Sequence, residues 1–266
     1  MPLAVCATPI GNLADVTLRV LDELAAADTV LCEDTRHTRR LLQRHGIEAR
    51  LLSYHRHNEA SRTDELVPRL VAGERIALVS DAGLPGVNDP GARLVAAALA
   101  AGVAVTVLPG PSAVETALVA SGLAGVQYRF VGYLPRGERE RGALWQELSV
   151  WAHPTVAFES PKRLPSTLAS LAAAEPERLV AVCRELTKAF EEIACGTAAE
   201  LAARYDEPPK GEVTLVIGPS TRVADAAKAV SAVAELVAAG APRGVAAGVV
   251  SRLTGVARNT LYGDSL

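Results

Sequence analysis

Short apolar runs alternate with amphipathic runs along the first half of the chain. The apolar runs have the length of buried strands and end at Gly, Pro or Asp residues. The amphipathic runs place leucines at helical spacing, as at Leu18, Leu21 and Leu24. This pattern predicts strands at 3–7, 29–32, 50–53, 75–80 and 103–108, separated by helices at 17–26, 36–45, 61–72 and 90–101. Such alternation is typical of an α/β fold with a mostly parallel sheet and helices on both faces.

The second half of the chain has a different pattern. Strands are expected at 129–133, 154–159, 179–185, 190–196 and 212–217, with the third and fourth forming a hairpin-like pair. Beyond residue 218 the chain is rich in Ala and Val and predicts only helices, including a helix, a Gly turn and a helix over 245–262. We therefore predict an α/β domain over 1–122, an α+β domain with a mixed sheet over 123–218, and a tail over 219–266 that resembles a helix-turn-helix.

Composition indicates a folded chain without a membrane span. Of the 266 residues, 49% are hydrophobic and 21% are charged, which excludes a disordered chain. Residues 94–114 carry no charge, but Gly and Pro interrupt them, so a helix end, a strand and a turn are expected there. No signal peptide is expected at the N-terminus. The four cysteines have no metal-binding spacing and predict buried, reduced thiols in a cytoplasmic protein without a metal site.

Charge is distributed unevenly along the chain. The net charge of −3 excludes a basic coat over the whole surface. Between Arg36 and Arg62, however, seven arginines and two acidic residues give a charge of +5, and four of the five histidines lie in the same segment. Arginine contacts phosphate through two hydrogen bonds and stacks on bases, so this basic segment is a candidate RNA-binding surface. The alternative is a solvated basic helix.

Turn-forming residues follow four strands of the predicted parallel sheet. Residues 8–12, 33–36, 80–91 and 109–113 read TPIGN, EDTR, SDAGLPGVNDPG and PGPSA. Because ligands bind outside the carboxyl ends of parallel strands, these loops are expected to converge on one crevice. Glycine lets the backbone approach a ligand closely, and Asp81 offers an acceptor for a ribose or an amino group. The absence of G-x-G-x-x-G and Walker A motifs disfavours ordinary dinucleotide and nucleoside triphosphate sites.

Seven longer motifs together resemble one family. They are TPIGNLADVTLR at 8–19, CEDTRHT at 32–38, SDAGLPGVNDPG at 80–91, LPGPSA at 108–113, GYLPR at 132–136, FESPKR at 158–163 and CRELTK at 183–188. Over residues 3–218 they are similar to ribosomal RNA small subunit methyltransferase I, within the tetrapyrrole methylase superfamily. The resemblance implies an S-adenosylmethionine-dependent enzyme with two α/β domains. It further implies methylation of the ribose 2′-oxygen of a cytidine in the decoding centre of 16S rRNA by a cytoplasmic homodimer.

The resemblance also implies a set of cofactor-binding residues. In the first domain they lie on the loops that follow the strands: Pro9, Asp81, Ala82, Gly83, Val87, Ser112 and Ala113. In the second domain they are expected to flank the adenosine: Phe158, Leu186, Glu212, Val213 and Thr214.

Methyl transfer to a ribose hydroxyl requires that the methyl group lie in line with the attacking oxygen. Because the 2′-OH is a poor acid, a nearby group that accepts its proton or its hydrogen bond helps the reaction. Carboxylates considered for this role are Glu33, Asp34, Glu159 and Glu185. We expect Asp34 or Glu33 to accept the proton or orient the ribose; the alternative for Asp34 is a helix cap or an ion pair with Arg36. Ser160 is expected to cap a helix with Pro161 in its first turn. RNA contacts are expected from Arg36, Arg39, Arg40, Arg44, Arg56, Lys162 and Arg163.

Two other functions stay open at this point. A superfamily relative could act on a tetrapyrrole or a protein residue, and a non-catalytic RNA-binding protein could assist ribosome assembly. The basic segment and the tail argue against a small tetrapyrrole, which would need neither. The four loops argue against a pure binding protein, which has no use for a cofactor crevice. The tail itself is expected either to contact RNA or to cap the fold.

Overall fold

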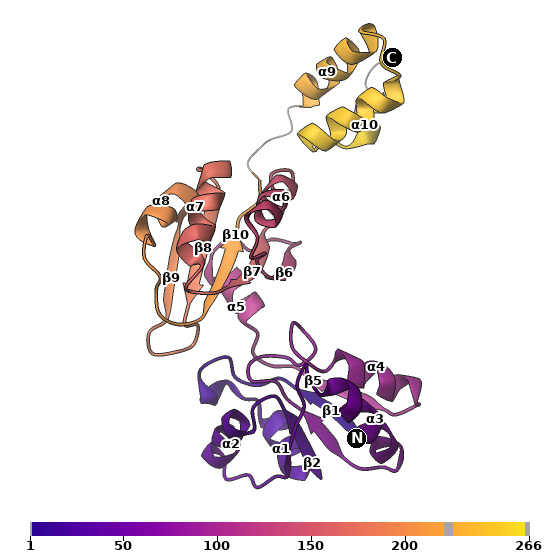
Figure 1. Cartoon of the computed structure of the whole chain (residues 1–266), viewed down its shortest axis with the longest axis vertical. Helices are drawn as coiled ribbons and strands as arrows, with labels where there is room; N and C mark the ends of the chain where they lie inside the picture. The colour runs from indigo at the N-terminus through magenta and orange to yellow at the C-terminus, as the bar shows by residue number, and fades with distance from the viewer. Residues whose placement is uncertain (1, 221–225, 264–266) are drawn as a thin grey trace. The chain divides into compact units, whose positions relative to one another are not determined.

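The computed structural model describes residues 2–220 and 226–263 (Figure 1). The chain divides into two compact units. Unit 1 comprises residues 1–117 together with 184–192, and unit 2 comprises residues 118–183 together with the chain from 193 onward. The segment Arg184–Glu192 therefore leaves unit 2, joins unit 1 and returns. The predicted boundaries near 122 and 218 remain predictions.

Unit 1 is built on a five-stranded sheet (Figure 1). Its strands are β1 (Leu3–Cys6), β2 (Thr29–Cys32), β3 (Leu51–Ser53), β4 (Ile76–Leu78) and β5 (Val105–Leu108). Their order is β3-β2-β4-β1-β5, and every neighbouring pair is parallel. The expected parallel sheet is thus confirmed, with each strand close to its predicted range.

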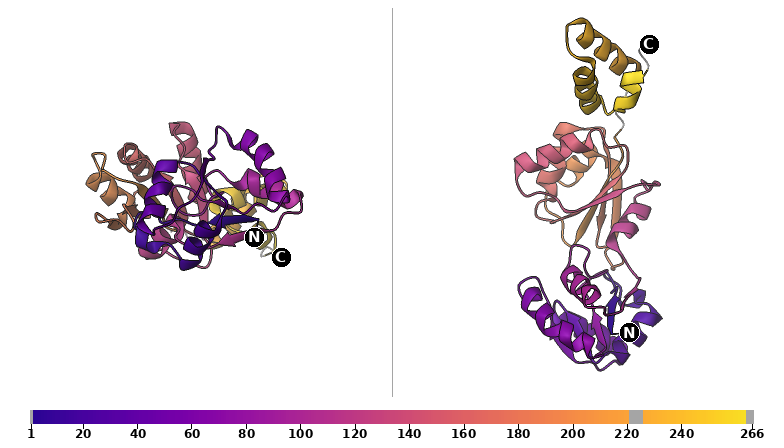
Figure 2. Two further views of the ribbon diagram at one scale, coloured as in Figure 1. Left: turned by 90° about the horizontal axis from the view of Figure 1, so that it is seen from below. Right: turned by 90° about the vertical axis from the view of Figure 1, so that its right-hand side faces the viewer.

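Helices cover both faces of this sheet (Figure 2). Helices α1 (Leu18–Ala26) and α2 (Thr35–Arg44) bury Leu24 and Leu41 against one face. Helices α3 (Glu59–Val71) and α4 (Ala92–Ala100) bury Leu66 and Leu94 against the other. Alternate residues of one strand point to opposite faces, so Leu3 and Val5 join the second core while Ala4 and Cys6 join the first. A short 3-10 helix, η1 (Leu13–Asp15), follows β1.

The charge-free stretch 94–114 forms most of α4, a turn, β5 and the start of α5 (Ala113–Ala120), as expected. Among the described residues, no helix is long and apolar enough to cross a membrane. Cys6, Cys32 and Cys183 are buried free thiols, whereas Cys195 is exposed, so the expectation of burial is wrong for that one cysteine. Its thiol lies at a strand position facing outward, where it donates to the carbonyl of Ser121.

Unit 2 contains the predicted mixed sheet. Its strands are β6 (Arg129–Tyr133), β7 (Thr155–Glu159), β8 (Leu179–Arg184), β9 (Glu192–Thr197) and β10 (Val213–Ile217), in the order β6-β7-β10-β8-β9. Strand β6 runs parallel to β7, and β10 runs antiparallel to it. Strands β8 and β9 are neighbours, as the hairpin-like pattern predicts. The core contains Trp145, Leu168 and Leu215, and the helices are α6 (Glu138–Leu148), α7 (Leu164–Ala174) and α8 (Ala198–Arg204).

The C-terminal part of the chain forms only helices where it is described. These are α9 (Ala226–Ala238), α10 (Arg243–Thr254) and α11 (Arg258–Gly263), with a small core of their own around Val233, Ala247 and Leu261. Gly255 ends α10 with a φ of 74°, in the left-handed region that glycine adopts without strain. The predicted helix, Gly turn and helix are therefore present, although the part of the predicted tail at 221–225 and 264–266 lies outside the described residues.

One predicted helix start is wrong. Helix α7 begins at Leu164, and Arg163 rather than Ser160 precedes its first turn. The carbonyl of Ser160 accepts hydrogen bonds from the backbone of Arg163 and Leu164, so residues 160–163 form a turn before the helix. Pro165, not Pro161, occupies the first helical turn.

Candidate active site

The centre of the candidate site is the junction between β1 and β4. These strands are adjacent, but the helices that follow them, α1 and α4, cover opposite faces of the sheet. In an open α/β sheet, ligands bind at the carboxyl edge where neighbouring strands lead to opposite faces, and β1 and β4 meet this condition. Backbone hydrogen bonds in both directions join Thr8 and Gly83 (2.8 and 3.0 Å), and the Thr8 hydroxyl donates to the carbonyl of Ser80 (3.0 Å).

The loop after β5 contacts both of these loops. A Cβ on Gly110 would lie 2.9 Å from the Cβ of Ala7, so only glycine allows this approach without displacement. A Cβ on Gly83 would lie 3.8 Å from the carbonyl oxygen of Pro111. The structure thus brings three loops together, and they carry seven of the expected cofactor-binding residues: Pro9, Asp81, Ala82, Gly83, Val87, Ser112 and Ala113. Of these, Ser112 uses its hydroxyl to hydrogen-bond Glu115 at the start of α5.

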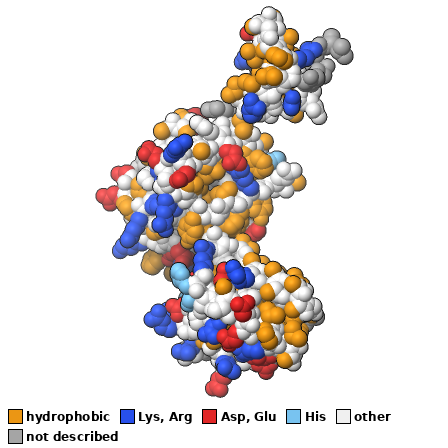
Figure 3. Space-filling view, turned by 45° about the vertical axis from the view of Figure 1, so that its right-hand side comes forward, with side chains coloured by type: hydrophobic (Ala, Val, Ile, Leu, Met, Phe, Trp, Pro, Cys, Tyr) orange, Lys and Arg blue, Asp and Glu red, His pale blue; other side chains and the backbone are white. Residues whose placement is uncertain are grey.

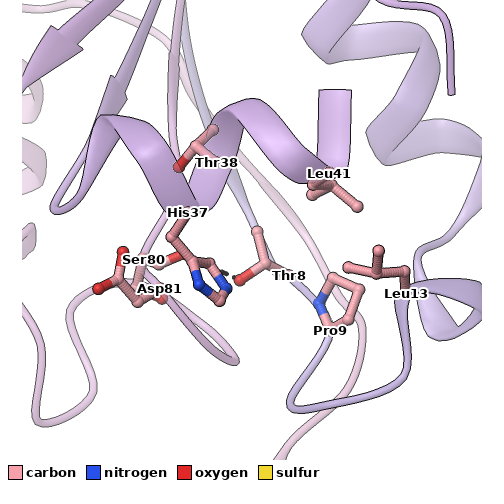
Figure 4. A pocket seen from close by; sticks show the side chains of 8 residues that line it. All are labelled: Thr8, Pro9, Leu13, His37, Thr38, Leu41, Ser80 and Asp81. Atoms are coloured by element: carbon pink, nitrogen blue, oxygen red, sulfur yellow. Dashed lines mark hydrogen bonds between the residues drawn. The ribbon is translucent and has the colours of Figure 1, made fainter. Parts of the chain in front are cut away.

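A small, shallow pocket lies between the first loop and α2 (Figure 4). It is lined by Thr8, Pro9, Leu13, His37, Thr38, Leu41, Ser80 and Asp81. Figure 4 shows the ring of Pro9 and the side chain of Leu13 on one side, and His37, Ser80 and Asp81 on the other. Pro9 and Asp81 were expected at a ligand site, whereas His37 was expected only as part of the basic segment.

The loop after β2 is attached to this assembly through Asp34. The backbone N–H of Asp34 donates to Oδ1 of Asp81 (3.1 Å). Its own carboxylate caps α2 by accepting from the backbone N–H of Arg36 (2.8 Å), and it pairs with the Arg36 guanidinium (3.4 Å). These hydrogen bonds lower the pKa of Asp34, which makes its carboxylate a good hydrogen-bond acceptor and a weak proton acceptor. The structure therefore shows Asp34 as the cap of α2, which is the alternative interpretation of this residue.

Asp89 belongs to the same edge and was missed by the sequence analysis. Burial raises the pKa of Asp89 to about 6, and the nearby carboxylates of Glu33 and Asp81 act in the same direction. Arg56 partly offsets them. The motif at 80–91 contains this aspartate, but an Asp-Pro-Gly sequence is typical of a turn, and its partial burial near Glu33 depends on packing across the sheet edge.

A segment from the second half of the chain covers the first loop. The Thr187 hydroxyl accepts a hydrogen bond from the backbone N–H of Asn12 (3.0 Å). A Cβ on Gly11 would lie 2.5 Å from Lys188 Cγ and 2.9 Å from the carbonyl oxygen of Leu186. Leu186, an expected cofactor-binding residue, is only 6% exposed and belongs to unit 1 through this contact.

The backbone of this covering segment is strained. Glu185 and Thr187 have φ values of 51° and 65°, and the left-handed region is unfavourable for a β-branched residue such as Thr187. The Lys188–Glu185 ion pair (2.8 Å) and a hydrogen bond from the Thr187 N–H to Glu191 hold the conformation. Glu185, one of the carboxylates considered as a base, is therefore engaged in an ion pair.

The other expected adenosine contacts lie in unit 2. Phe158 on β7 is directly opposite Thr214 on β10, and Val213 is opposite Glu159. Glu212 immediately precedes β10 and is exposed. The carboxylate of Glu159 is buried, accepts from the Thr167 hydroxyl (2.6 Å) and pairs with Arg163, so it is an internal structural group.

The basic residues divide into exposed and engaged groups. Arg36, Arg39, Arg40 and Arg44 are exposed on α2, whose buried face carries Thr38, Leu41 and Leu42. Figure 3 shows basic and histidine side chains gathered on part of the surface of unit 1, interspersed with acidic ones. Two further expected RNA contacts have partners within the chain: Arg56, which is exposed, donates to the carbonyl of Asn88, and Arg163 pairs with Glu159 and donates to the carbonyl of Leu134. Lys162 is exposed.

No group of three or more His, Cys, Asp or Glu in the described residues has a geometry that could hold a metal ion. The glycine-dependent loop contacts, the Asp81 carboxylate and the apolar Pro9 surface instead fit a small organic ligand with a cationic end.

Comparison with known proteins defines the class. The model of the family described as Tetrapyrrole (Corrin/Porphyrin) Methylases matches residues 2–202. Solved structures agree in fold: the methyltransferase CobJ has a TM-score of 0.63 at 20% identity, covering 82% of this chain and 94% of that one. A cobalt precorrin-4 methyltransferase, CbiF, has a TM-score of 0.58 at 17% identity, covering 81% and 94%. The protein is an S-adenosylmethionine-dependent methyltransferase with the tetrapyrrole methylase fold.

Relatives with higher sequence identity narrow the class to one family. The chain is 43% identical to ribosomal RNA small subunit methyltransferase I of Mesorhizobium japonicum, over 98% of this chain and 90% of the relative. It is 45% identical to the protein of the same name from Micromonospora olivasterospora, over 96% and 83%. The chain therefore belongs to the ribosomal RNA small subunit methyltransferase I family of tetrapyrrole methylases, and the resemblance in its motifs is confirmed.

Gly11→Ala is expected to weaken binding of S-adenosylhomocysteine at least tenfold. The added Cβ meets Leu186, Thr187 and Lys188 at 2.5–2.9 Å and displaces either the first loop or the segment that covers it. Isothermal titration calorimetry measures the affinity. Gly142→Ala on α6 is the matched control, because a Cβ there meets nothing within 4 Å. Equal affinity of the folded Gly11→Ala variant and the wild type would contradict this expectation.

Asp89→Asn is expected to stabilise the protein at pH 8 by on the order of 1 kcal/mol. Because the pKa of Asp89 is raised in the folded state, its protonated form stabilises the fold below about pH 4, and this contribution is lost as the pH rises through about 6. The gain from Asn should therefore shrink between pH 8 and pH 4.5 in urea unfolding. Asp22→Asn at an exposed position of α1 is the control, and a pH-independent difference for Asp89→Asn would refute the assignment.

Proposed function

We propose that this protein transfers a methyl group from S-adenosylmethionine to the ribose 2′-oxygen of a cytidine in the decoding centre of 16S rRNA. The observation that carries the proposal is the similarity to proteins named ribosomal RNA small subunit methyltransferase I across almost the whole chain. The exposed arginines of α2, directly after the loop of Glu33 and Asp34, support an RNA substrate. We further propose that the enzyme works in the cytoplasm as a homodimer on the small ribosomal subunit.

In this proposal the loops of unit 1 hold the cofactor. The carboxylate of Asp81 receives the amino group of the methionine end, and the backbone at Ala82, Gly83, Ser112 and Ala113 approaches it closely because glycines shape the loops. Pro9 would face the cofactor, and Val87 would lie over its sulfonium side. The adenosine is flanked by the second set of residues, namely Phe158, Leu186, Glu212, Val213 and Thr214. When bound, the cofactor supplies an electrophilic methyl group on sulfur.

The protein contributes positioning more than proton abstraction. Asp34 keeps its carboxylate ionised because the Arg36 N–H stabilises the charge, so it accepts a hydrogen bond from the ribose hydroxyl and aligns the oxygen for in-line attack. Glu33 lies beside it, half-buried, and is the proposed proton acceptor. In this arrangement Asp34 serves both as the cap of α2 and as an orienting group.

The RNA backbone is proposed to contact α2. Arg39, Arg40 and Arg44 are exposed and make no ion pair within the described part of the chain, so their charge is available to phosphates. Arg36 shares its charge with Asp34, and Lys162 of unit 2 adds a separate cation. Binding that depends on so few cations is expected to be confined to limited surfaces and to weaken with salt.

The two alternatives are weaker. Tetrapyrrole methylases among the solved structures share the fold at 20% identity or less, whereas the rRNA methyltransferases match at 43–45%. A non-catalytic assembly factor would have no need for three loops held in contact by glycines.

Transfer of labelled methyl groups tests the reaction. The protein is incubated with labelled S-adenosylmethionine and small ribosomal subunits that lack the modification, with naked 16S rRNA in parallel, and the label is mapped by nuclease digestion. Label on the ribose of one decoding-centre cytidine is expected. Label on a base, on a protein, or only on an added tetrapyrrole would overturn the proposal.

Replacement of Arg39, Arg40 and Arg44 by Ala is expected to weaken rRNA binding at least tenfold and to leave S-adenosylhomocysteine binding unchanged. Each lost phosphate contact should lower the slope of log affinity against log salt concentration by about one. Arg40→Ala alone is compared with Arg93→Ala, an exposed arginine of α4 on the other face of the sheet. Equal salt slopes for these two single variants would remove α2 from the RNA interface.

A further inference from the structure

Three aromatic side chains gather on β6 and β7 of unit 2. The ring centroids of Phe130 and Phe158 lie 4.9 Å apart, and those of Tyr133 and Phe158 lie 5.6 Å apart, both in edge-to-face arrangement. Tyr133 is 61% exposed, and the two phenylalanines are partly buried. We call these three residues the aromatic platform.

A bulge in β6 creates the platform. Phe130 is opposite Val156 and Tyr133 is opposite Phe158. A span of three residues along β6 therefore pairs with a span of two along β7. In a regular strand, residues three apart point to opposite faces, and Tyr133 would face away from Phe130. The extra residue lies at Val131–Gly132, where Gly132 has a φ of 68°. The bulge therefore redirects Tyr133 to the face of the sheet that carries Phe158.

Two cations lie on the loops that leave this corner of the sheet. Because β6 and β7 are parallel, both loops start at the same edge, and they are joined by the Leu134 N–H to the Phe158 carbonyl (3.1 Å) and by Arg163 to the Leu134 carbonyl (3.1 Å). Arg136 on one loop and Lys162 on the other are exposed. Neither makes an ion pair with any residue that the structure describes.

An exposed ring beside two uncompensated cations has the chemistry of a single-stranded nucleic-acid site. Every nucleobase has a face that stacks on an aromatic ring, and the adjoining phosphates attract Lys and Arg. An apolar protein partner would not favour exposed Lys162, because lysine is depleted in protein interfaces. The chain as a whole has a net charge of −3, so the exposed Tyr133 ring and the two cations form a local feature and not part of a general basic surface.

We propose that Tyr133 stacks on an unpaired base of the rRNA substrate, with Phe158 and Phe130 fixing its ring and with Arg136 and Lys162 contacting the adjacent phosphates. The proposal rests on the proposed RNA substrate and adds a second contact region to it, on unit 2. Stacking supplies affinity without sequence selectivity, so the platform is expected to hold an unpaired nucleotide whatever its base.

Filter binding of 16S rRNA in the presence of saturating S-adenosylhomocysteine tests the platform in the full-length protein. Tyr133→Ala is expected to weaken binding about tenfold without changing the salt slope, because stacking involves no phosphate contact. Tyr133→Phe should bind within about twofold of the wild type. Arg136→Ala and Lys162→Ala should each lower the salt slope by about one. Phe190→Ala, at an aromatic residue that is 75% exposed, is the matched control and should have no effect.

The outcomes are separable. If Tyr133→Ala binds rRNA like the wild type while the wild type methylates the ribose, the platform is wrong and the proposed function stands. If Tyr133→Ala instead loses affinity for S-adenosylhomocysteine, Tyr133 belongs with Phe158 to the cofactor contacts and not to an RNA site, and the proposal is overturned. If the wild type neither binds nor methylates rRNA, both proposals fail. Because Tyr133 is exposed, circular dichroism and thermal unfolding of Tyr133→Ala should match the wild type.

Discussion

The paired backbone hydrogen bonds between Thr8 and Gly83 set the geometry on which the rest of the site depends. They join two loops that leave adjacent parallel strands toward opposite faces of the sheet, which is where an open α/β sheet forms a crevice. The loop after β5 is added through the close approach of Gly110 to Ala7, and the loop after β2 through the Asp34 N–H to Asp81. These contacts join the four loops at one edge of the sheet, and an aligned methyl transfer requires groups that are held in fixed positions.

Two carboxyl groups at this edge of the sheet have pKa values that are shifted in opposite directions. The pKa of Asp34 is lowered by hydrogen bonds at the start of α2, whereas the pKa of Asp89 is raised to about 6 by burial and by neighbouring carboxylates. One sheet edge thus holds one carboxylate that is firmly ionised and another that titrates near neutral pH. Charge is also distributed unevenly over the whole chain. The net charge is −3, yet the exposed face of α2 is almost entirely basic.

Departures from regular backbone geometry occur where we infer ligand contacts. The left-handed backbone at Thr187 lets its hydroxyl reach Asn12 and seats Leu186 against the first loop. The bulge at Gly132 redirects Tyr133 across the sheet. The left-handed backbone costs conformational energy at Thr187 but not at Gly132, and each departure moves a side chain to a place that a regular strand or loop would not reach.

Local sequence determined the elements of this protein: strands such as β2 and β6 begin and end at their predicted residues, because apolar runs bounded by turn residues encode them directly. The strand-end loops predict in the same way where the cofactor binds, and three of them do meet at one edge of the sheet. Tertiary structure alone decided that Asp89 is partly buried near Glu33, that Leu186 covers Gly11, and that Arg56 and Arg163 donate to the carbonyls of Asn88 and Leu134. These features depend on contacts between residues far apart in the chain, and no periodicity within a single segment carries information about which distant residue will lie against it.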